Sequence, residues 1–150
     1  ETQLFGAVDA GLCPPDATVC HPGTHNKWAR LEGGRLVSFR TVMTGEMFNL
    51  LKGGSLLKAW LARPAEPGAS FIRGVDQGLA GHALTADLFT VRASVLLGTL
   101  AEEDVASFVS GLLIGADLRM GLADAPEGEI VVMGRGALTR LYAAALTHLG

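Results

Sequence analysis

The sequence has few of the features that mark several large classes of protein. Two cysteines in 150 residues are too few for a disulfide scaffold, and the spacing of Cys13 and Cys20 is not that of a zinc site. Charged residues make up only 18% of the chain, and the formal net charge is −3. These values argue against binding to nucleic acid or to a membrane surface by charge. We expect both thiols to be free, as in a cytoplasmic protein.

Long hydrophobic runs and targeting signals are also missing. The longest uncharged stretch near the middle, residues 105–116, has 12 residues, whereas about 20 are needed to cross a bilayer. No basic segment followed by an apolar one resembles a signal peptide. The chain begins at Glu1 in a helical pattern without an initiator methionine, so we expect it to be part of a longer polypeptide.

Apolar residues, in contrast, are abundant. They make up 49% of the chain, which is rich for a free-standing domain of this size. A length of 150 residues suits one domain or one lobe of a larger protein. We therefore expect another lobe to cover part of the surface, with a homodimer as an alternative partner.

The apolar spacing predicts an α/β lobe. It changes between a period of 2 and a period of about 3.6, which indicates a helix, three antiparallel strands, several helices, a strand and a last helix. A three-stranded meander cannot bury both faces alone, so we expect the late strand to join it and the helices to cover it. The expected strands are 18–20, 27–31, 36–41 and 129–134. The expected helices are 1–12, one from Thr44, 71–79, 85–97, 99–121 and 136–149.

Two threonines are expected to begin helices. Thr44 precedes an apolar stripe and can cap its helix with its hydroxyl. Thr99 stands three residues before Glu102, the spacing of a capping box at the start of the long helix.

The stretch "HPGTHNKW" is the first candidate site. A hairpin tip with Gly23 and Thr24 lets backbone N–H groups converge on one anion. His25 and Lys27 would share one face of an alternating strand and could both donate to phosphate oxygens. The alternative, a tight turn whose polar side chains simply face water, stays open on these residues alone.

The stretch "IVVMGRGALTRL" is the second candidate site. Here a buried strand runs into Gly134, Gly136 and Ala137, and a helix follows. Glycines at such a turn let a nucleotide approach the backbone, and a helix N-terminus favours negative groups. The motif lacks the third glycine of a dinucleotide fingerprint, so a plain strand-to-helix turn stays open as well.

The order of these two stretches is the layout of the C-terminal lobe in the actin, hexokinase and sugar-kinase superfamily. The segments "ETQLFGA", "HPGTHNKWARL", "FRTVMTGEMFNLL", "LFTVRASVLLG" and "SGLLIGADLR" resemble the 2-dehydro-3-deoxygalactonokinase family, over essentially the whole chain. His21 stands where leucine is usual in that family, and Asn26 where serine is usual. The resemblance implies an actin/hexokinase-like fold in which residues 1–150 are the nucleotide-binding C-terminal lobe and the N-terminal lobe is absent.

The resemblance also implies an activity and roles for residues. The activity is ATP-dependent phosphorylation of 2-dehydro-3-deoxy-D-galactonate on its 6-hydroxyl, with Mg²⁺, in galactonate breakdown. Gly23 and Thr24 would form the second phosphate loop, with His25 and Lys27 as supporting donors. The adenosine pocket would take Gly134, Gly136 and Ala137. The general base would be Glu1 or a residue just before it.

Two other functions remain open. A nucleotide-binding regulatory module without catalysis would keep the same lobe, because a fold does not determine a function. A kinase for another sugar acid would also fit, since no segment is recognisable as the reader of the substrate's carboxylate. The identity of the sugar acid therefore rests on the resemblance.

Overall fold

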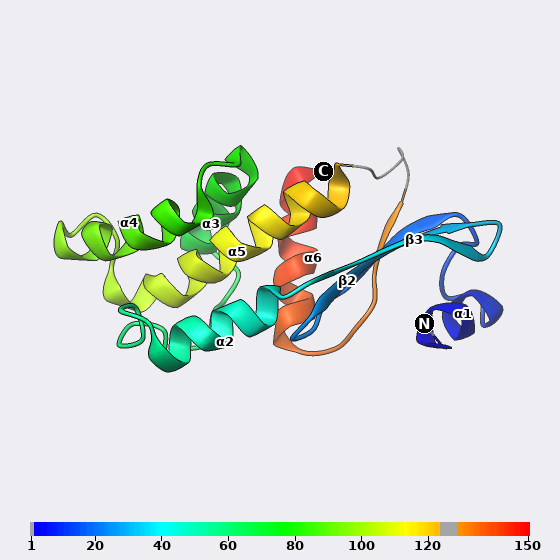
Figure 1. Cartoon of the computed structure of the whole chain (residues 1–150), viewed down its shortest axis with the longest axis horizontal. Coiled ribbons are helices and arrows are strands. Elements are labelled where there is room, and N and C mark those ends of the chain that lie inside the picture. Colours follow the sequence, from blue (N-terminus) through cyan, green and yellow to red (C-terminus); the bar gives the residue numbers. More distant parts are fainter. Residues whose placement is uncertain (1, 124–128) are drawn as a thin grey trace.

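A four-stranded mixed sheet and a group of helices lie side by side in the computed structural model, which describes residues 2–123 and 129–150 (Figure 1). The α/β class predicted from the sequence is confirmed. The strands are β1 (Ala17–His21), β2 (Asn26–Glu32), β3 (Arg35–Val42) and β4 (Ile130–Val132). The helices are α1 (Thr2–Asp9), α2 (Thr44–Gly54), α3 (Ala69–Ala80), α4 (Leu84–Leu96), α5 (Val105–Leu122) and α6 (Ala137–Leu149), with a 3₁₀ turn at Glu102–Asp104 before α5.

The sheet combines the predicted meander with the late strand, in the order β3-β2-β1-β4. The strands β1, β2 and β3 are antiparallel neighbours, whereas β4 runs parallel to β1. Gly33 and Gly34 both have positive φ, 54° and 74°, as a two-residue hairpin turn between twisted strands requires. The late strand is shorter than predicted, although the Met133 amide still bonds the Cys20 carbonyl at 2.8 Å.

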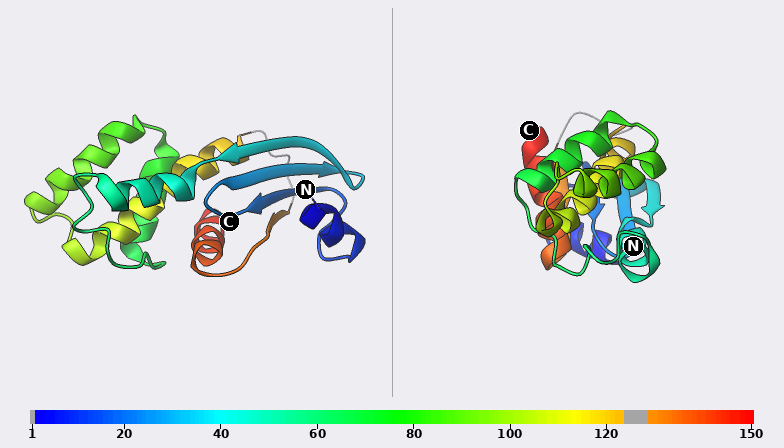
Figure 2. Two further views of the ribbon diagram at one scale, coloured as in Figure 1. Left: turned by 60° about the horizontal axis from the view of Figure 1, so that its bottom comes forward. Right: turned by 90° about the vertical axis from the view of Figure 1, so that its left-hand side faces the viewer.

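The strands β1 and β2 are covered on both faces, whereas most residues of β3 are exposed. Neighbouring residues of a strand point to opposite faces. Val19 and Ala29 are register partners and pack against α1 (Figure 2). The next pair, Cys20 and Trp28, packs on the other face against α5 and α6. Burial of the Cys20 thiol raises its pKa, with a further contribution from Asp117, so this cysteine stays protonated in the core.

The helix α5 is the centre of the helical part, and glycines bring it into backbone contact with α3. A Cβ atom on Gly111 would lie 2.1 Å from the Phe71 carbonyl oxygen, and one on Gly74 would lie 2.2 Å from the Phe108 carbonyl oxygen. Residues Glu102–Leu122 are long and apolar enough to cross a membrane, a longer segment than the uncharged run indicated. Since 67% of the most apolar window of that segment is buried inside the protein, we interpret it as the core helix.

Both predicted helix caps are wrong. Thr44 is the first residue of α2, and its hydroxyl bonds a side chain of α5 instead of a free amide of its own helix. The Thr99 hydroxyl donates to the Ser94 carbonyl at 3.1 Å, at the end of α4. The Thr99 and Leu100 amides bond the same carbonyl at 2.9 and 3.2 Å. Thr99 therefore belongs to the end of α4, and α5 begins only after the 3₁₀ turn.

Candidate nucleotide-binding site

The two glycine-containing stretches meet because β1 and β4 are parallel neighbours. Parallel strands have their carboxyl ends at the same edge of a sheet, and ligands bind there in open α/β folds. The first stretch follows β1 directly after His21, and the second follows β4 after Val132. Motifs more than one hundred residues apart in the sequence thus come to one edge.

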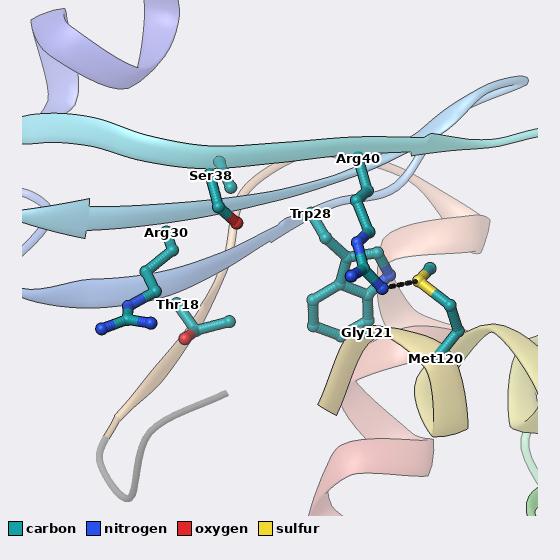
Figure 3. Close-up of a pocket in the computed structure, with 8 residues that line it drawn as sticks. Thr18, Trp28, Arg30, Ser38, Arg40, Met120 and Gly121 are labelled. Carbon is teal, nitrogen blue, oxygen red and sulfur yellow. Dashed lines mark hydrogen bonds between the residues drawn. The ribbon is translucent and has the colours of Figure 1, made fainter. Parts of the chain in front are cut away.

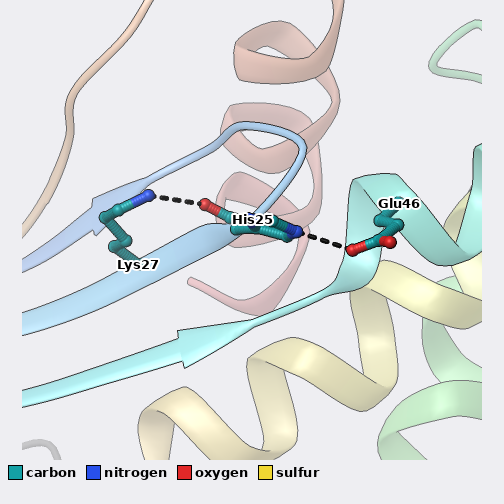
Figure 4. Close-up of polar contacts among 3 residues, drawn as sticks. All are labelled: His25, Lys27 and Glu46. Atoms are coloured by element: carbon teal, nitrogen blue, oxygen red, sulfur yellow. Dashed lines mark hydrogen bonds and ion pairs between the residues drawn. The ribbon is translucent and has the colours of Figure 1, made fainter.

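The first turn of α2 holds the loop of residues 22–25, which we call the Thr24 loop. The Glu46 amide donates to the Thr24 carbonyl at 2.8 Å, and the Glu46 carboxylate lies 2.6 Å from Nε2 of His25 (Figure 4). Gly45 lies so close that a Cβ atom on it would be 2.6 Å from the Gly23 carbonyl oxygen. The Thr24 loop can therefore lie this close to α2 only because residue 45 has no side chain.

His25 and Lys27 do not point to one place. His25 precedes β2, so the alternation of the strand does not govern its side chain. Its imidazole points towards Glu46, whereas the Lys27 ammonium lies on the other side and donates to the His25 carbonyl at 3.0 Å (Figure 4). The His25 imidazole therefore supports the Thr24 loop by its contact with Glu46 of α2. The Lys27 ammonium supports the loop by its bond to the His25 carbonyl.

The second stretch makes a turn for which glycine is required. Gly134 and Gly136 have φ values of +152° and +88°, in the region that L-residues with a side chain rarely adopt. A Cβ atom on Gly134 would also lie 2.7 Å from the Thr139 hydroxyl. The helix α6 then begins at Ala137, whose amide is among the free N–H groups of the first turn.

A cavity of about 280 Å³ lies between the two stretches. Thr24 borders it from the loop, and Ala137 borders it from the start of α6. Gly23, His25, Lys27, Gly134 and Gly136 do not line it. Most of the wall is apolar and comes from α2, α5 and α6, as is usual for sites that hold a flat ring. The principal apolar side chains of the wall are Phe48, Leu113, Ile114, Leu138 and Leu141.

Two polar side chains in the wall were not foreseen from the sequence. Asn49 extends from α2, and Ser110 extends from α5. Ser110 is only 6% exposed, and its hydroxyl makes no hydrogen bond within the part of the chain that the structure describes. Nothing in the sequence marked these two positions, because their proximity depends on how α2 packs on α5.

A buried carboxylate joins the elements around this cavity. Asp117, in α5, is 3% exposed. Its Oδ1 accepts a hydrogen bond from the Trp28 indole at 2.8 Å. Its Oδ2 accepts from the side-chain amide of Asn26 at 2.8 Å and from the Thr44 hydroxyl at 2.6 Å. The Tyr142 hydroxyl also donates to Oδ2. Burial and the Asp117 charge raise the pKa of Tyr142, so it remains a donor. The sequence signal was a single acid at the end of an apolar stretch.

A pocket of only about 30 Å³ lies beside Trp28, on the face of the sheet that α5 covers (Figure 3). Arg40 and Met120 border it beside the Trp28 ring, and the Arg40 guanidinium lies 3.4 Å from the Met120 sulfur. Space of this size holds about one water molecule. This pocket is therefore excluded as a nucleotide site.

The described residues define no site for the Mg²⁺ ion, and they do not include the predicted general base. Within residues 2–123 and 129–150, no group of three or more His, Cys, Asp or Glu side chains could hold a metal ion. The residues present therefore do not fit a Mg²⁺ site of their own. Glu1, the predicted base, lies outside the described residues.

Comparison with known proteins identifies the family. The family model described as 2-keto-3-deoxy-galactonokinase matches residues 1–150. The 2-dehydro-3-deoxygalactonokinase of Escherichia coli K12 is 41% identical over 152 residues, and a proposed 2-dehydro-3-deoxygalactonokinase of Rhizobium meliloti is 37% identical over 155 residues. Both alignments cover 100% of this chain, and 51% and 50% of the relatives. The chain thus spans about half the length of these curated relatives.

A solved structure agrees with this assignment. The crystal structure of a proposed 2-dehydro-3-deoxygalactonokinase from Sinorhizobium meliloti superimposes with a TM-score of 0.90 and 36% sequence identity. The match covers 99% of this chain and 51% of that one. The fold is therefore that of about half of this kinase chain, consistent with the predicted actin/hexokinase-like class. By sequence and by fold, the chain belongs to the 2-keto-3-deoxy-galactonokinase family.

Proposed function

We propose that this chain is the nucleotide-binding, C-terminal lobe of a two-lobe kinase that transfers the terminal phosphoryl group of ATP to the 6-hydroxyl of 2-dehydro-3-deoxy-D-galactonate. The observation that carries the proposal is the cavity bordered by both Thr24 and Ala137. The Thr24 border suits phosphates, and the Ala137 border suits a nucleoside. The sugar acid in this proposal is taken from the family name. The other lobe, the sugar acid and a cytoplasmic location are parts of the same proposal.

In this proposal the adenosine enters the cavity and the phosphates extend to the Thr24 loop. The apolar wall takes the adenine ring, with Phe48 and Leu138 among its members. Asn49 and Ser110 supply the polar contacts, because Thr44, the other side chain of the α2 and α5 wall with a hydrogen-bonding group, already donates its hydroxyl to Asp117. Gly134 and Gly136 have no side chains, so the nucleotide can approach the backbone of the turn before α6.

The loop acts on the phosphates by electrostatic stabilisation. Backbone N–H groups of Gly23 and Thr24 and the Thr24 hydroxyl donate to phosphate oxygens, where negative charge develops during transfer. His25 keeps the loop in place through Glu46. Mg²⁺ would supply charge neutralisation at the phosphates, and no described residue is assigned to hold it. Glu1 remains our candidate for the base that removes the proton of the attacking hydroxyl.

A kinase of this type needs both lobes, since closure excludes water from the reacting phosphoryl group. We therefore expect no phosphorylation by residues 1–150 alone. Turnover by this segment in isolation would contradict the two-lobe proposal. A regulatory module that binds ATP without catalysis, and a kinase for another sugar acid, are the alternatives.

The test is an assay of ADP release by the full-length protein that carries this chain. The substrates are 2-dehydro-3-deoxy-D-galactonate, its gluconate epimer and plain galactonate. We expect turnover of the first in preference to the others. Turnover of another acid would replace the substrate, and ATP binding without any turnover would favour the regulatory module.

A further inference from the structure

A second cavity lies between α1 and the sheet. The β1–β2 hairpin separates it from the nucleotide cavity. Its volume is about 180 Å³, and it is lined by Gln3, Leu4, His21, Lys27, Ala29 and Phe39. We call it the α1 cavity. It shares no lining residue with the nucleotide cavity.

The strand register brings two basic side chains together in the α1 cavity. His21, the last residue of β1, lies directly opposite Lys27 in β2, so both side chains leave the sheet on the same face. Ala29 is two residues beyond Lys27 on that face, and Phe39 of β3 is its register partner. The helix α1 closes the cavity with Gln3 and Leu4.

The positive charge in this cavity has no counter-charge among the described residues. None of the six lining residues is acidic. Within residues 2–123 and 129–150, neither Lys27 nor His21 forms an ion pair. The Lys27 ammonium uses one of its three N–H donors on the His25 carbonyl, which leaves two for a ligand. A half-buried ammonium without an acidic partner is costly, and the His21 imidazole beside it can donate a further hydrogen bond, so this arrangement indicates an anionic ligand.

The neighbouring apolar side chains restrict the kind of anion. Leu4, Ala29 and Phe39 surround the two basic groups, which suits a carboxylate attached to carbon better than a free, fully hydrated phosphate. At the acidic end of a 2-dehydro-3-deoxy sugar acid, a carboxylate, a ketone and a methylene group follow one another. Lys27 and His21 match the carboxylate, the Gln3 amide matches the ketone, and the apolar side chains match the methylene group.

We infer that Lys27 recognises the carboxylate of the sugar acid, and that His21, which stands where leucine is usual in the family, adds a further donor to this subsite. This inference rests on the proposed kinase function and adds a residue-level basis for its preference for acids over neutral sugars. It differs from the prediction made from the sequence, in which Lys27 donates to ATP phosphates. The two assignments have different kinetic consequences, because one affects the sugar acid and the other affects ATP.

The test compares three variants of the full-length protein. Lys27→Met removes the charge and keeps the length of the side chain, and His21→Leu fills similar space without a donor. Lys58→Met is the matched control, since Lys58 is exposed and lines neither cavity. KM is measured for ATP, for 2-dehydro-3-deoxy-D-galactonate and for its analogue in which a primary amide replaces the carboxylate.

For Lys27→Met we expect KM for the acid to rise about 10- to 100-fold, as for loss of a charge-assisted hydrogen bond. KM for ATP should change much less, because the contacts of the Thr24 loop with Glu46 remain. The wild type should prefer the acid to the amide by a similar factor, and the variant should lose this preference. His21→Leu should raise KM for the acid several-fold, and Lys58→Met should change nothing.

Two results would overturn the inference. A rise in KM for ATP with an unchanged KM for the acid would assign Lys27 to the phosphates. An unchanged acid-to-amide preference in both variants would show that the carboxylate binds elsewhere. Thermal unfolding of each variant separates these results from misfolding, and Lys27→Gln replaces Lys27→Met if the latter does not fold. Failure of the kinase proposal itself would appear separately, as a wild type that does not use the acid.

Discussion

The Thr44 hydroxyl donates a hydrogen bond of 2.6 Å to the Asp117 carboxylate, which fastens the first residue of α2 to α5. The same carboxylate accepts bonds from Asn26 and Trp28 of β2 and from Tyr142 of α6. All of these elements border the nucleotide cavity or the Thr24 loop. One buried acid therefore determines how the sheet, α2 and α6 are placed around the site.

Asp117→Ala should destabilise the protein strongly. The substitution leaves four buried donors without their acceptor, and one unsatisfied buried donor costs about 1–3 kcal/mol. Urea unfolding measures the loss. Asp76→Ala is the control, because Asp76 makes an exposed ion pair with His148 whose loss costs about 1 kcal/mol or less. Equal effects of the two substitutions would contradict the structural role of Asp117.

Gly45→Ala should weaken nucleotide binding without unfolding the protein. The added methyl group would lie 2.6 Å from the Gly23 carbonyl oxygen, so the Thr24 loop must move away from α2. We expect the Kd of a non-hydrolysable ATP analogue to rise about tenfold or more, which corresponds to about 1.4 kcal/mol. Calorimetric titration measures this change.

The control for Gly45→Ala lies in the same helix. Gly53 has no atom within 4 Å of the position of an added Cβ, so Gly53→Ala should leave the affinity unchanged and stabilise α2 by about 0.5–1 kcal/mol. If Gly45→Ala binds the analogue as tightly as Gly53→Ala does, α2 does not position the loop.

Asn49 should contribute to recognition of the nucleotide. Its side chain lines a mainly apolar wall, where a hydrogen bond to a neutral group contributes about 0.5–1.5 kcal/mol. Asn49→Ala should therefore raise KM for ATP about 2- to 10-fold and leave KM for the sugar acid unchanged. Steady-state kinetics of the full-length protein measure both values, and a change confined to the sugar acid would remove Asn49 from the nucleotide site.

His21 should make the stability depend on pH. Burial and the neighbouring Lys27 ammonium lower the pKa of His21 below its ordinary value of 6.5. As the pH falls through about 6.5, the unfolded chain binds a proton that the folded protein does not yet bind, so the free energy of unfolding decreases. The decrease ends below the pKa of the folded state.

Urea unfolding between about pH 5 and pH 7 measures this effect, because an unperturbed histidine titrates in that range. His21→Leu should reduce the slope of stability against pH relative to the wild type. Equal slopes in the two proteins would show that the pKa of His21 is not lowered by folding.

The sequence alone determined the features that depend on neighbours along the chain. The hairpin at Gly33 and Gly34, the order of strands and helices, and the glycines at 134 and 136 follow from local backbone requirements and from apolar spacing. Five other local segments, "HPGTHNKWARL" among them, carried the family resemblance, which the comparisons confirm.

The tertiary structure decided what depends on contacts between distant segments. Thr44 bonds Asp117 rather than its own helix, because α2 begins against α5. Asn49 and Ser110 share a wall, and His21 shares a cavity with Gln3, only after the helices pack. Side-chain directions such as those of His25 and Lys27 are determined by the partners that folding supplies. No local pattern encodes these partners, because they lie up to 73 positions apart in the sequence.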